Sequence, residues 1–287
     1  MHLFCFGLGY SALNLATSLL EQGWRVSGTV RTAAKGDNLK KLGITSYILG
    51  DGLPLQEIWD LNSVTHILHS IPPVNSAENE DVNCDIVYRY HLGDIKKLPK
   101  LQWFGYLSTT GVYGDHKGGW VDETTPVNPT NKRSRLRVIA ENAWLSAGLP
   151  VHIFRLSGIY GPGRSVLDEL KAGTARRIYK ENQVFSRIHV DDINQILQKS
   201  MQNPQAGNIY NCADDEPAPQ EEIVARAAKL LGLPIPPLVD FDKADLSEMA
   251  KSFWQSNRRV RNDKIKQELG VRLKYKNWKD GMSSILT

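Results

Sequence analysis

A glycine-rich turn close to the amino terminus constrains this chain more than any other feature. Residues 3–6 are apolar, residues 7–12 read Gly-Leu-Gly-Tyr-Ser-Ala, and apolar residues then recur at helical spacing until Gly23. In a G-x-G-x-x-A turn, the first glycine permits a tight bend, the second lets the backbone approach a ligand, and the small third residue lets the helix pack on the strand. This order predicts a strand, a turn and a helix whose amino end can bind an anion.

The same alternation continues through the first two thirds of the chain. Short apolar runs predict strands at residues 3–6, 25–30, 46–49, 65–70, 103–108 and 151–156. Helical spacing predicts helices at residues 11–22, 81–97, 131–147 and 220–231. Runs that are apolar on both faces are typical of parallel sheets covered by helices on both sides. We therefore predict an α/β fold of the Rossmann type, with a doubly wound parallel sheet and a smaller carboxy-terminal α/β substrate domain.

The boundary between the two expected domains follows a change of rhythm after Gly161, where prolines interrupt the pattern. We expect residues 1–160 plus 188–212 to form the dinucleotide-binding domain. Residues 161–187 plus 213–287 are then expected to form the smaller substrate-binding domain, which would supply one wall of a cleft.

Composition excludes several classes of protein. With 41% hydrophobic and 23% charged residues in 287, the chain is neither disordered nor a small disulfide-knotted scaffold. A net charge of +4 is too small to demand nucleic acid, although it suits an anionic small molecule. The three cysteines are far apart, which argues against disulfides and a metal site. Polar residues interrupt the uncharged first 20 residues, so we expect a cytoplasmic protein without a membrane anchor.

The end of the second predicted strand bears on which nicotinamide cofactor fits. A site for NAD places Asp or Glu there to bind the ribose 2′-hydroxyl, but this chain reads Gly28-Thr29-Val30-Arg31-Thr32, and Lys35 follows. A guanidinium suits the 2′-phosphate of NADP. We therefore predict NADP in preference to NAD, and the alternative is that Arg31 is a solvated loop residue.

Several motifs in order resemble those of the extended short-chain dehydrogenase/reductase family, in particular its atypical bacterial branch of NAD-dependent epimerase/dehydratase-like proteins. They are the turn at residues 7–12, Gly50-Asp51, the segment 107–114 (Leu-Ser-Thr-Thr-Gly-Val-Tyr-Gly), Arg155 to Gly163 and Arg187 to Asp192. The resemblance extends over nearly the whole chain.

What the resemblance implies can be stated position by position. Thr109 would help to orient a substrate carbonyl, and Tyr113 would be either catalytic or part of a packed turn. The segment 69–72 would run along the cofactor, and Ser157 would approach the nicotinamide. The expected cofactor-binding residues are Gly7, Leu8, Gly9, Tyr10, Ser11, Arg31, Thr32, Asp51, Ser70, Ile71, Pro72, Ser108 and Ser157.

The chain departs from the family that it resembles at the positions on which that family's chemistry depends. The family uses a Tyr and a Lys four positions apart on one helix, and the matching positions here are Arg133 and Arg137. A guanidinium keeps its proton at physiological pH, so Arg133 cannot replace the phenol. Arg137 remains a candidate to bind cofactor ribose or a substrate anion, unless residues 132–137 are simply a basic surface. The other candidate proton donors are Tyr113, Tyr160, His189 and Asp115.

A second departure concerns the substrate. Where epimerases of this family often carry an Arg that binds a nucleotide-sugar phosphate, this chain has Phe185, and the nearest Arg is Arg187. A shift by two residues keeps the same strand face, so an anion site would be displaced. A nucleotide-sugar substrate is therefore not favoured.

Two functions remain open. The first is an NADP(H)-dependent oxidoreductase or epimerase/dehydratase-like enzyme. The second is a protein that binds NADP(H) as a redox sensor without catalysis. In both cases we expect a small-molecule partner, no nucleic acid and no membrane, and either a monomer or a homodimer formed through the helices at 81–97 and 131–147.

Overall fold

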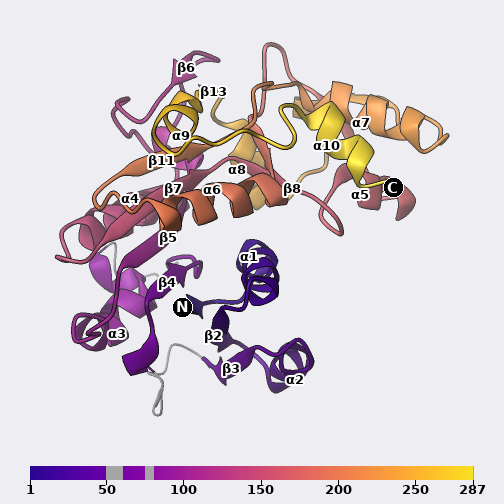
Figure 1. Ribbon diagram of the computed structural model, residues 1–287. Coiled ribbons are helices and arrows are strands. Elements are labelled where there is room, and N and C mark those ends of the chain that lie inside the picture. The colour runs from indigo at the N-terminus through magenta and orange to yellow at the C-terminus, as the bar shows by residue number, and fades with distance from the viewer. Residues whose placement is uncertain (50–60, 75–80, 287) are drawn as a thin grey trace. The chain divides into compact units, whose positions relative to one another are not determined.

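The computed structural model describes residues 1–49, 61–74 and 81–286 (Figure 1). The chain divides into two compact units. The first unit contains residues 1–109, 132–155 and 196–210, and the second contains residues 110–131, 156–195 and 211–287. Asp51, an expected cofactor ligand, lies outside the described residues.

A seven-stranded sheet dominates the first unit. Its strands are β1 (His2–Phe6), β2 (Arg25–Val30), β3 (Thr45–Ile48), β4 (His66–His69), β5 (Trp103–Thr109), β7 (Val151–Leu156) and β11 (Ile209–Cys212). Their order is β11-β7-β5-β4-β1-β2-β3, and β1 pairs in parallel with both β2 and β4. The chain thus runs outward from β1 in both directions, and the predicted doubly wound parallel sheet is confirmed. Ligands of such sheets bind at the carboxyl ends of the strands where the order reverses, which here is beside β1 and β4.

Helices connect these strands, as the alternating pattern predicts. They are α1 (Tyr10–Glu21), α2 (Ala33–Lys41), α3 (Ile86–Ile95), α4 (Lys132–Leu145) and α6 (Val190–Gln202). The helix predicted from residue 81 begins later, because Asp85 caps α3 by accepting hydrogen bonds from the amides of Val87 and Tyr88. Residues 82–84 form a short 3₁₀ turn, η2 (Val82–Cys84), instead.

The second unit is built from short elements. In chain order they are η3 (Thr110–Tyr113), β6 (Trp120–Val121), β8 (Gly158–Tyr160), α5 (Val166–Lys171), β9 (Arg177–Tyr179), β10 (Arg187–His189), α7 (Gln220–Leu230), β12 (Leu238–Asp240), η4 (Phe241–Lys243), α8 (Glu248–Trp254), β13 (Arg259–Val260), α9 (Asp263–Glu268) and α10 (Trp278–Ser284). Parallel pairing of β6 with β13 and of β8 with β10 ties residues 110–131 and 156–160 to the carboxy-terminal part. The boundaries of the two observed units therefore differ from the boundaries expected for the two domains.

Each unit has its own hydrophobic core. In the first unit Phe4, Phe6, Phe104 and Trp144 are essentially inaccessible to solvent and belong to one cluster. In the second unit, Leu167 and residues of α7 pack with Trp278 and Met282 of α10. A separate core is the physical basis for the compactness of each unit. Among the described helices, none has the length and apolar character needed to cross a membrane.

The packing of Gly105 in β5 generates a prediction. A methyl group placed there would lie 2.1 Å from the ring of Trp103, which is fully buried and cannot move aside. We expect Gly105→Ala to lower the free energy of unfolding by about 1–3 kcal/mol, the usual cost of overpacking a core. Urea denaturation of the purified protein measures this change.

The matched control is Gly93→Ala. Gly93 lies inside α3 and is exposed, and a methyl group added to it would meet nothing within 4 Å. Because alanine favours helix, this variant should be more stable than the parent by about 0.5–1 kcal/mol. Equal effects of the two substitutions would contradict the packing argument.

Candidate functional site

The turn after β1 is held in place by the neighbouring strand. Gly7 has a φ of +86°, a conformation that other residues rarely adopt. Its amide donates to Thr29 Oγ1 (2.8 Å), and the Leu8 amide donates to the Thr29 carbonyl (2.9 Å). Both bonds tie the turn to β2 and hold its shape.

The two glycines of the turn face different surroundings. A methyl group on Gly7 would lie 2.8 Å from Ile71 Cγ1 and 3.1 Å from Ser70 Oγ, and the Ser70 hydroxyl donates to the Gly7 carbonyl. A methyl group on Gly9 would meet nothing within 4 Å. Gly7 is therefore required by close packing, whereas Gly9 leaves open space for a ligand. The structure brings the predicted residues Gly7, Ser70 and Ile71 together, and Pro72 is exposed.

The amino end of α1 has the properties of an anion site. No side chain caps it, and its first turn contains no acidic residue. The amides of Leu8 and Gly9 donate to carbonyls within the turn and β2, so the donors for an anion come from the first turn of α1, which begins with Tyr10 and Ser11. The helix dipole adds a partial positive charge at this position.

The residues that follow β2 carry positive charge toward solvent. Arg31 and Lys35 are exposed, and residues 25–36 contain no Asp or Glu. Thr32, an expected cofactor ligand, caps α2 by accepting a hydrogen bond from the Lys35 amide (3.4 Å). Arg31 and Lys35 are thus the side chains available to a phosphate at this strand end.

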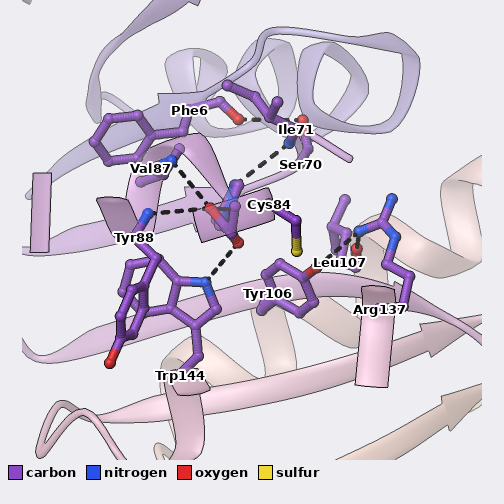
Figure 2. A network of polar contacts seen from close by, with 12 residues as sticks. Phe6, Ser70, Ile71, Cys84, Val87, Tyr88, Tyr106, Leu107, Arg137 and Trp144 are labelled. Carbon is purple, nitrogen blue, oxygen red and sulfur yellow. Dashed lines mark hydrogen bonds and ion pairs between the residues drawn. The ribbon is translucent and has the colours of Figure 1, made fainter. Parts of the chain in front are cut away.

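A buried carboxylate organises the loop after β4. Trp144 Nε1 donates to Asp85 Oδ2 (2.9 Å), and the same carboxylate caps α3 by accepting from the amides of Val87 and Tyr88. Dashed lines in Figure 2 mark the bonds that Val87, Tyr88 and Trp144 donate. His69 Nε2 lies 2.9 Å from Oδ2, and the Ile71 amide donates to His69 Nδ1 (3.4 Å). This series of hydrogen bonds joins a core carboxylate to the backbone that packs on Gly7.

The surroundings of Asp85 favour its ionised form. Burial by itself would raise the pKa of Asp85. The attraction and hydrogen bond of His69, with hydrogen bonds from Trp144 and the Tyr88 amide, outweigh burial and hold the pKa below its usual value. Sequence reasoning missed the roles of Asp85, His69 and Trp144. The signal that could have found Asp85 is its position as an acidic residue directly before a helix.

The carboxyl end of β5 adjoins a second buried network. Glu141 of α4 is 2% exposed and accepts from Arg155 through both Nε (3.2 Å) and Nη2 (2.7 Å). The hydroxyl of Ser108 donates to the same carboxylate. Ser108, an expected cofactor ligand, therefore has its side chain in this network, while Thr109 is half-buried at the end of β5.

Arg133 and Arg137 lie four residues apart on α4. Arg137 Nη1 donates to the Leu107 carbonyl (2.6 Å) and the Tyr106 hydroxyl (3.2 Å), as Figure 2 shows. The Arg133 side chain is exposed over part of its length. Partial burial of its guanidinium lowers the pKa of Arg133, and the nearby charge of Arg137 lowers it further. An arginine nevertheless stays protonated in proteins, so neither side chain can exchange a proton at neutral pH.

The second unit holds the remaining expected residues. Tyr113 is fully buried and donates to Asn211 Oδ1 (2.8 Å), a geometry that suits a packed turn. Ser157 is buried, and its amide donates to the Cys212 carbonyl (3.0 Å). Hydrogen bonds from the Asn257 amide, against slight burial, lower the pKa of Asp115. Asp115 is thus a poor proton donor at neutral pH.

Two further side chains have structural partners within the second unit. The Asp191 amide donates to His189 Nδ1 (3.1 Å), so this ring nitrogen of a candidate proton donor already accepts a hydrogen bond. Arg187 Nη1 donates to the carbonyls of Phe185 (2.9 Å) and Ala218 (3.2 Å), so this nitrogen is already bound to the backbone. Within the described residues, no cluster of His, Cys, Asp and Glu has the arrangement of a metal site.

The Asp85 network generates a second prediction. We expect Asp85→Asn to lower the free energy of unfolding at pH 7 by about 2–3 kcal/mol, because charge-assisted hydrogen bonds in the interior are replaced by neutral ones. Since the folded pKa lies below the unfolded one, this contribution is complete above pH ~4 and is lost as pH falls through the folded pKa. The difference between parent and variant, measured by urea denaturation at pH 7 and pH 3, should therefore shrink in acid.

Asp81→Asn is the control for that comparison. Asp81 is an exposed carboxylate four residues earlier, and it accepts hydrogen bonds only from the amide and side chain of Asn83 among the described contacts. Its replacement should change stability by less than about 1 kcal/mol. A difference for Asp85→Asn that stays constant with pH would contradict the role given to its charge.

The chain is similar to proteins of one family. Residues 7–213 match the model of the NAD dependent epimerase/dehydratase family. Protein YeeZ of Escherichia coli K12 is 31% identical over 240 residues, which are 80% of this chain and 84% of that protein. The ADP-L-glycero-D-manno-heptose-6-epimerase of Brachyspira hyodysenteriae is 24% identical and covers 72% of this chain and 73% of its own length.

Solved structures share the fold of this chain. A functionally unknown conserved protein from Silicibacter pomeroyi is 48% identical, with a TM-score of 0.89 over 99% of this chain and 97% of that one. A dTDP-glucose 4,6-dehydratase from Bacillus anthracis, solved with NAD, has a TM-score of 0.80 at 20% identity over 100% and 95% of the two chains, so it shares the fold. The glycine turn, the sheet order and the family match lead to one conclusion. This chain belongs to the NAD-dependent epimerase/dehydratase family.

Proposed function

We propose that this protein binds NADP(H) at the carboxyl ends of β1 and β2 and acts as an oxidoreductase or epimerase/dehydratase-like enzyme on a small molecule. The observation that carries the proposal is the open, uncapped amino end of α1 beside Gly9, next to a β2 terminus that carries exposed Arg31 and no carboxylate. An anionic dinucleotide with an additional phosphate matches both features.

The residues present fit such a cofactor. The first turn of α1 holds the pyrophosphate, and Arg31 with Lys35 binds the 2′-phosphate through charge-assisted hydrogen bonds. Ser70 and Ile71, packed on Gly7, border the same turn. When bound, the nicotinamide ring gives or accepts a hydride.

On the substrate side, the Thr109 hydroxyl at the end of β5 donates a hydrogen bond to the reacting carbonyl oxygen. Neither Arg133 nor Arg137 exchanges the proton that accompanies hydride transfer, because a guanidinium does not ionise in this range. Another side chain, water or a substrate group therefore has to supply this proton. Two of the relatives named above are an epimerase and a dehydratase, and this supports hydride chemistry on a hydroxyl or carbonyl carbon.

A specific observation favours a second candidate, a non-catalytic sensor of the NADPH/NADP⁺ ratio. Both positions of the family's proton-handling pair are arginine, and the Tyr113 hydroxyl is buried against Asn211. A protein in which Arg133, Arg137 and Tyr113 transfer no proton would still bind the cofactor and report its redox state to a partner. Nicotinamide binding is common to both candidates, so only turnover separates them.

Cofactor preference provides a direct test of the site. We expect the parent to bind NADPH at least about tenfold more tightly than NADH, a difference of ~1.4 kcal/mol. Arg31→Asp should abolish or reverse this preference, because a carboxylate repels the 2′-phosphate and accepts a hydrogen bond from a ribose hydroxyl. Fluorescence titration with both reduced cofactors measures the ratio.

Lys40→Asp is the control for Arg31→Asp. Lys40 is exposed on the last turn of α2, so its replacement changes the net charge by the same amount away from the strand end. It should leave the NADPH/NADH ratio within about twofold of the parent. Equal affinities in the parent, or an unchanged ratio in Arg31→Asp, would overturn the NADP assignment.

Turnover is tested with NADPH tritiated at the 4-position and pooled carbonyl metabolites. We expect tritium to appear in product, and Thr109→Val to lower the rate at least about tenfold through loss of one hydrogen bond to developing charge. Thr174→Val, at an exposed threonine of the second unit, should retain the parent rate. An absence of transfer under all conditions, together with a partner complex that depends on cofactor redox state, would replace the enzyme by the sensor.

A further inference from the structure

The amino-terminal half of α4 carries positive charge that its own helix does not neutralise. Arg133, Arg137 and Glu141 follow one another at intervals of four, so they share one face of the helix. A glutamate four residues from an arginine commonly pairs with it. Here Glu141 is instead held by Arg155 on β7 and by Ser108 on β5. Glu141, the acidic residue on this helix face, is therefore already paired with Arg155 and Ser108.

Arg137 is fixed in position but has binding capacity left. One nitrogen, Nη1, donates to the Leu107 carbonyl and the Tyr106 hydroxyl, and the guanidinium lies 5.6 Å from the centre of the Tyr106 ring. These described contacts include no carboxylate and do not use Nε or Nη2. A guanidinium that is held by one edge presents the remaining donors in a fixed direction, which suits bidentate binding of an oxyanion.

Arg133 places a second guanidinium near that of Arg137. The charge of Arg137 contributes to lowering the pKa of Arg133, so the two cations are close enough to repel. The first turn of α4 contains no acidic residue, and Lys132 adds another positive charge. The partial positive charge of a helix amino end adds to this field. A bound anion would relieve the repulsion.

The sheet order separates this region from the phosphates of the cofactor. The glycine turn follows β1 and Arg31 follows β2, whereas Arg137 contacts residues of β5, which is two positions from β1 in the order β5-β4-β1. Thr109, two residues after Leu107, ends the same strand. The cationic pair thus adjoins the end of the sheet where the substrate carbonyl is proposed, away from the strand ends that hold the cofactor phosphates.

We propose that Arg133 and Arg137 bind an anionic group of the substrate, a carboxylate or a phosphate monoester, beside Thr109. The substrate part of this inference rests on the proposed function, whereas anion binding by the pair does not. The arginines neutralise and orient the ligand and keep their protons throughout. The family's proton-exchanging pair is thereby replaced by a pair that selects acidic substrates.

The experiment uses inorganic phosphate as the probe at low ionic strength, because exposed charges are screened by salt. Binding to the full-length protein saturated with NADPH is followed by isothermal titration. We expect the parent to bind phosphate, Arg137→Met and Arg133→Met each to weaken binding at least about fivefold, and the double variant to lose it. Arg135→Met, an exposed arginine of the same helix, should bind phosphate within about twofold of the parent.

Two further measurements keep the result interpretable. Arg137→Lys retains a charge but loses the bidentate fork, so it should bind phosphate more tightly than Arg137→Met and more weakly than the parent. Arg133→Met alters an exposed side chain and should fold normally, which makes its loss of phosphate binding informative even when Arg137→Met unfolds. NADPH affinity should change less than about twofold in every variant.

The outcomes that overturn the proposal are distinct from those that overturn the proposed function. The proposal fails when the parent does not bind phosphate, when Arg135→Met weakens binding as much as Arg137→Met, or when NADPH displaces phosphate. It also fails when Arg137→Met weakens NADPH binding at least about fivefold, because the arginine then serves the cofactor. A parent that binds phosphate but no nicotinamide cofactor, with binding lost in the arginine variants, overturns the proposed function and supports the anion site.

Discussion

The first unit depends on a turn that has no room for a side chain. Gly7 adopts a positive φ, is bonded through its amide to Thr29, and is covered by Ser70 and Ile71. These contacts join the ends of three adjacent strands, β2, β1 and β4, at the point where the chain changes direction across the sheet. The position of α1, and therefore the anion site at its amino end, follows from that junction. Asp85 and His69 stabilise the same junction from inside the core.

The positions of the strands and of the glycine turn along the chain could be predicted, because both depend on residues that are close together in the sequence. Each of the six expected strands begins and ends within about two residues of its prediction. Helix α2 was missed, since Leu39 is the single buried residue of a segment that is otherwise polar. Helix α6 was missed because it follows β10 directly at Val190, without a loop between them.

The chemistry of the site was less accessible to sequence reasoning, because its contacts join distant residues. Trp144 and Asp85 are 59 positions apart, and Tyr113 and Asn211 are 98 apart. No periodicity encodes such pairs. The sequence places Arg133 and Arg137 four residues apart, but it does not reveal the anchoring of Arg137 on Leu107. Thr32 differs from these residues, because its contact is local. Its side chain caps α2, and this hydrogen bond competes with the expected role of Thr32 in binding the cofactor.

The pairing of Glu141 with Arg155 and Ser108 has an evolutionary consequence. These contacts hold α4 against β5 and β7 without involving Arg133 or Arg137. The scaffold that orients the reactive helix face is thus separable from the side chains displayed on it. Evolution can therefore vary the side chains at positions 133 and 137 while Glu141, Arg155 and Ser108 keep the helix in its place.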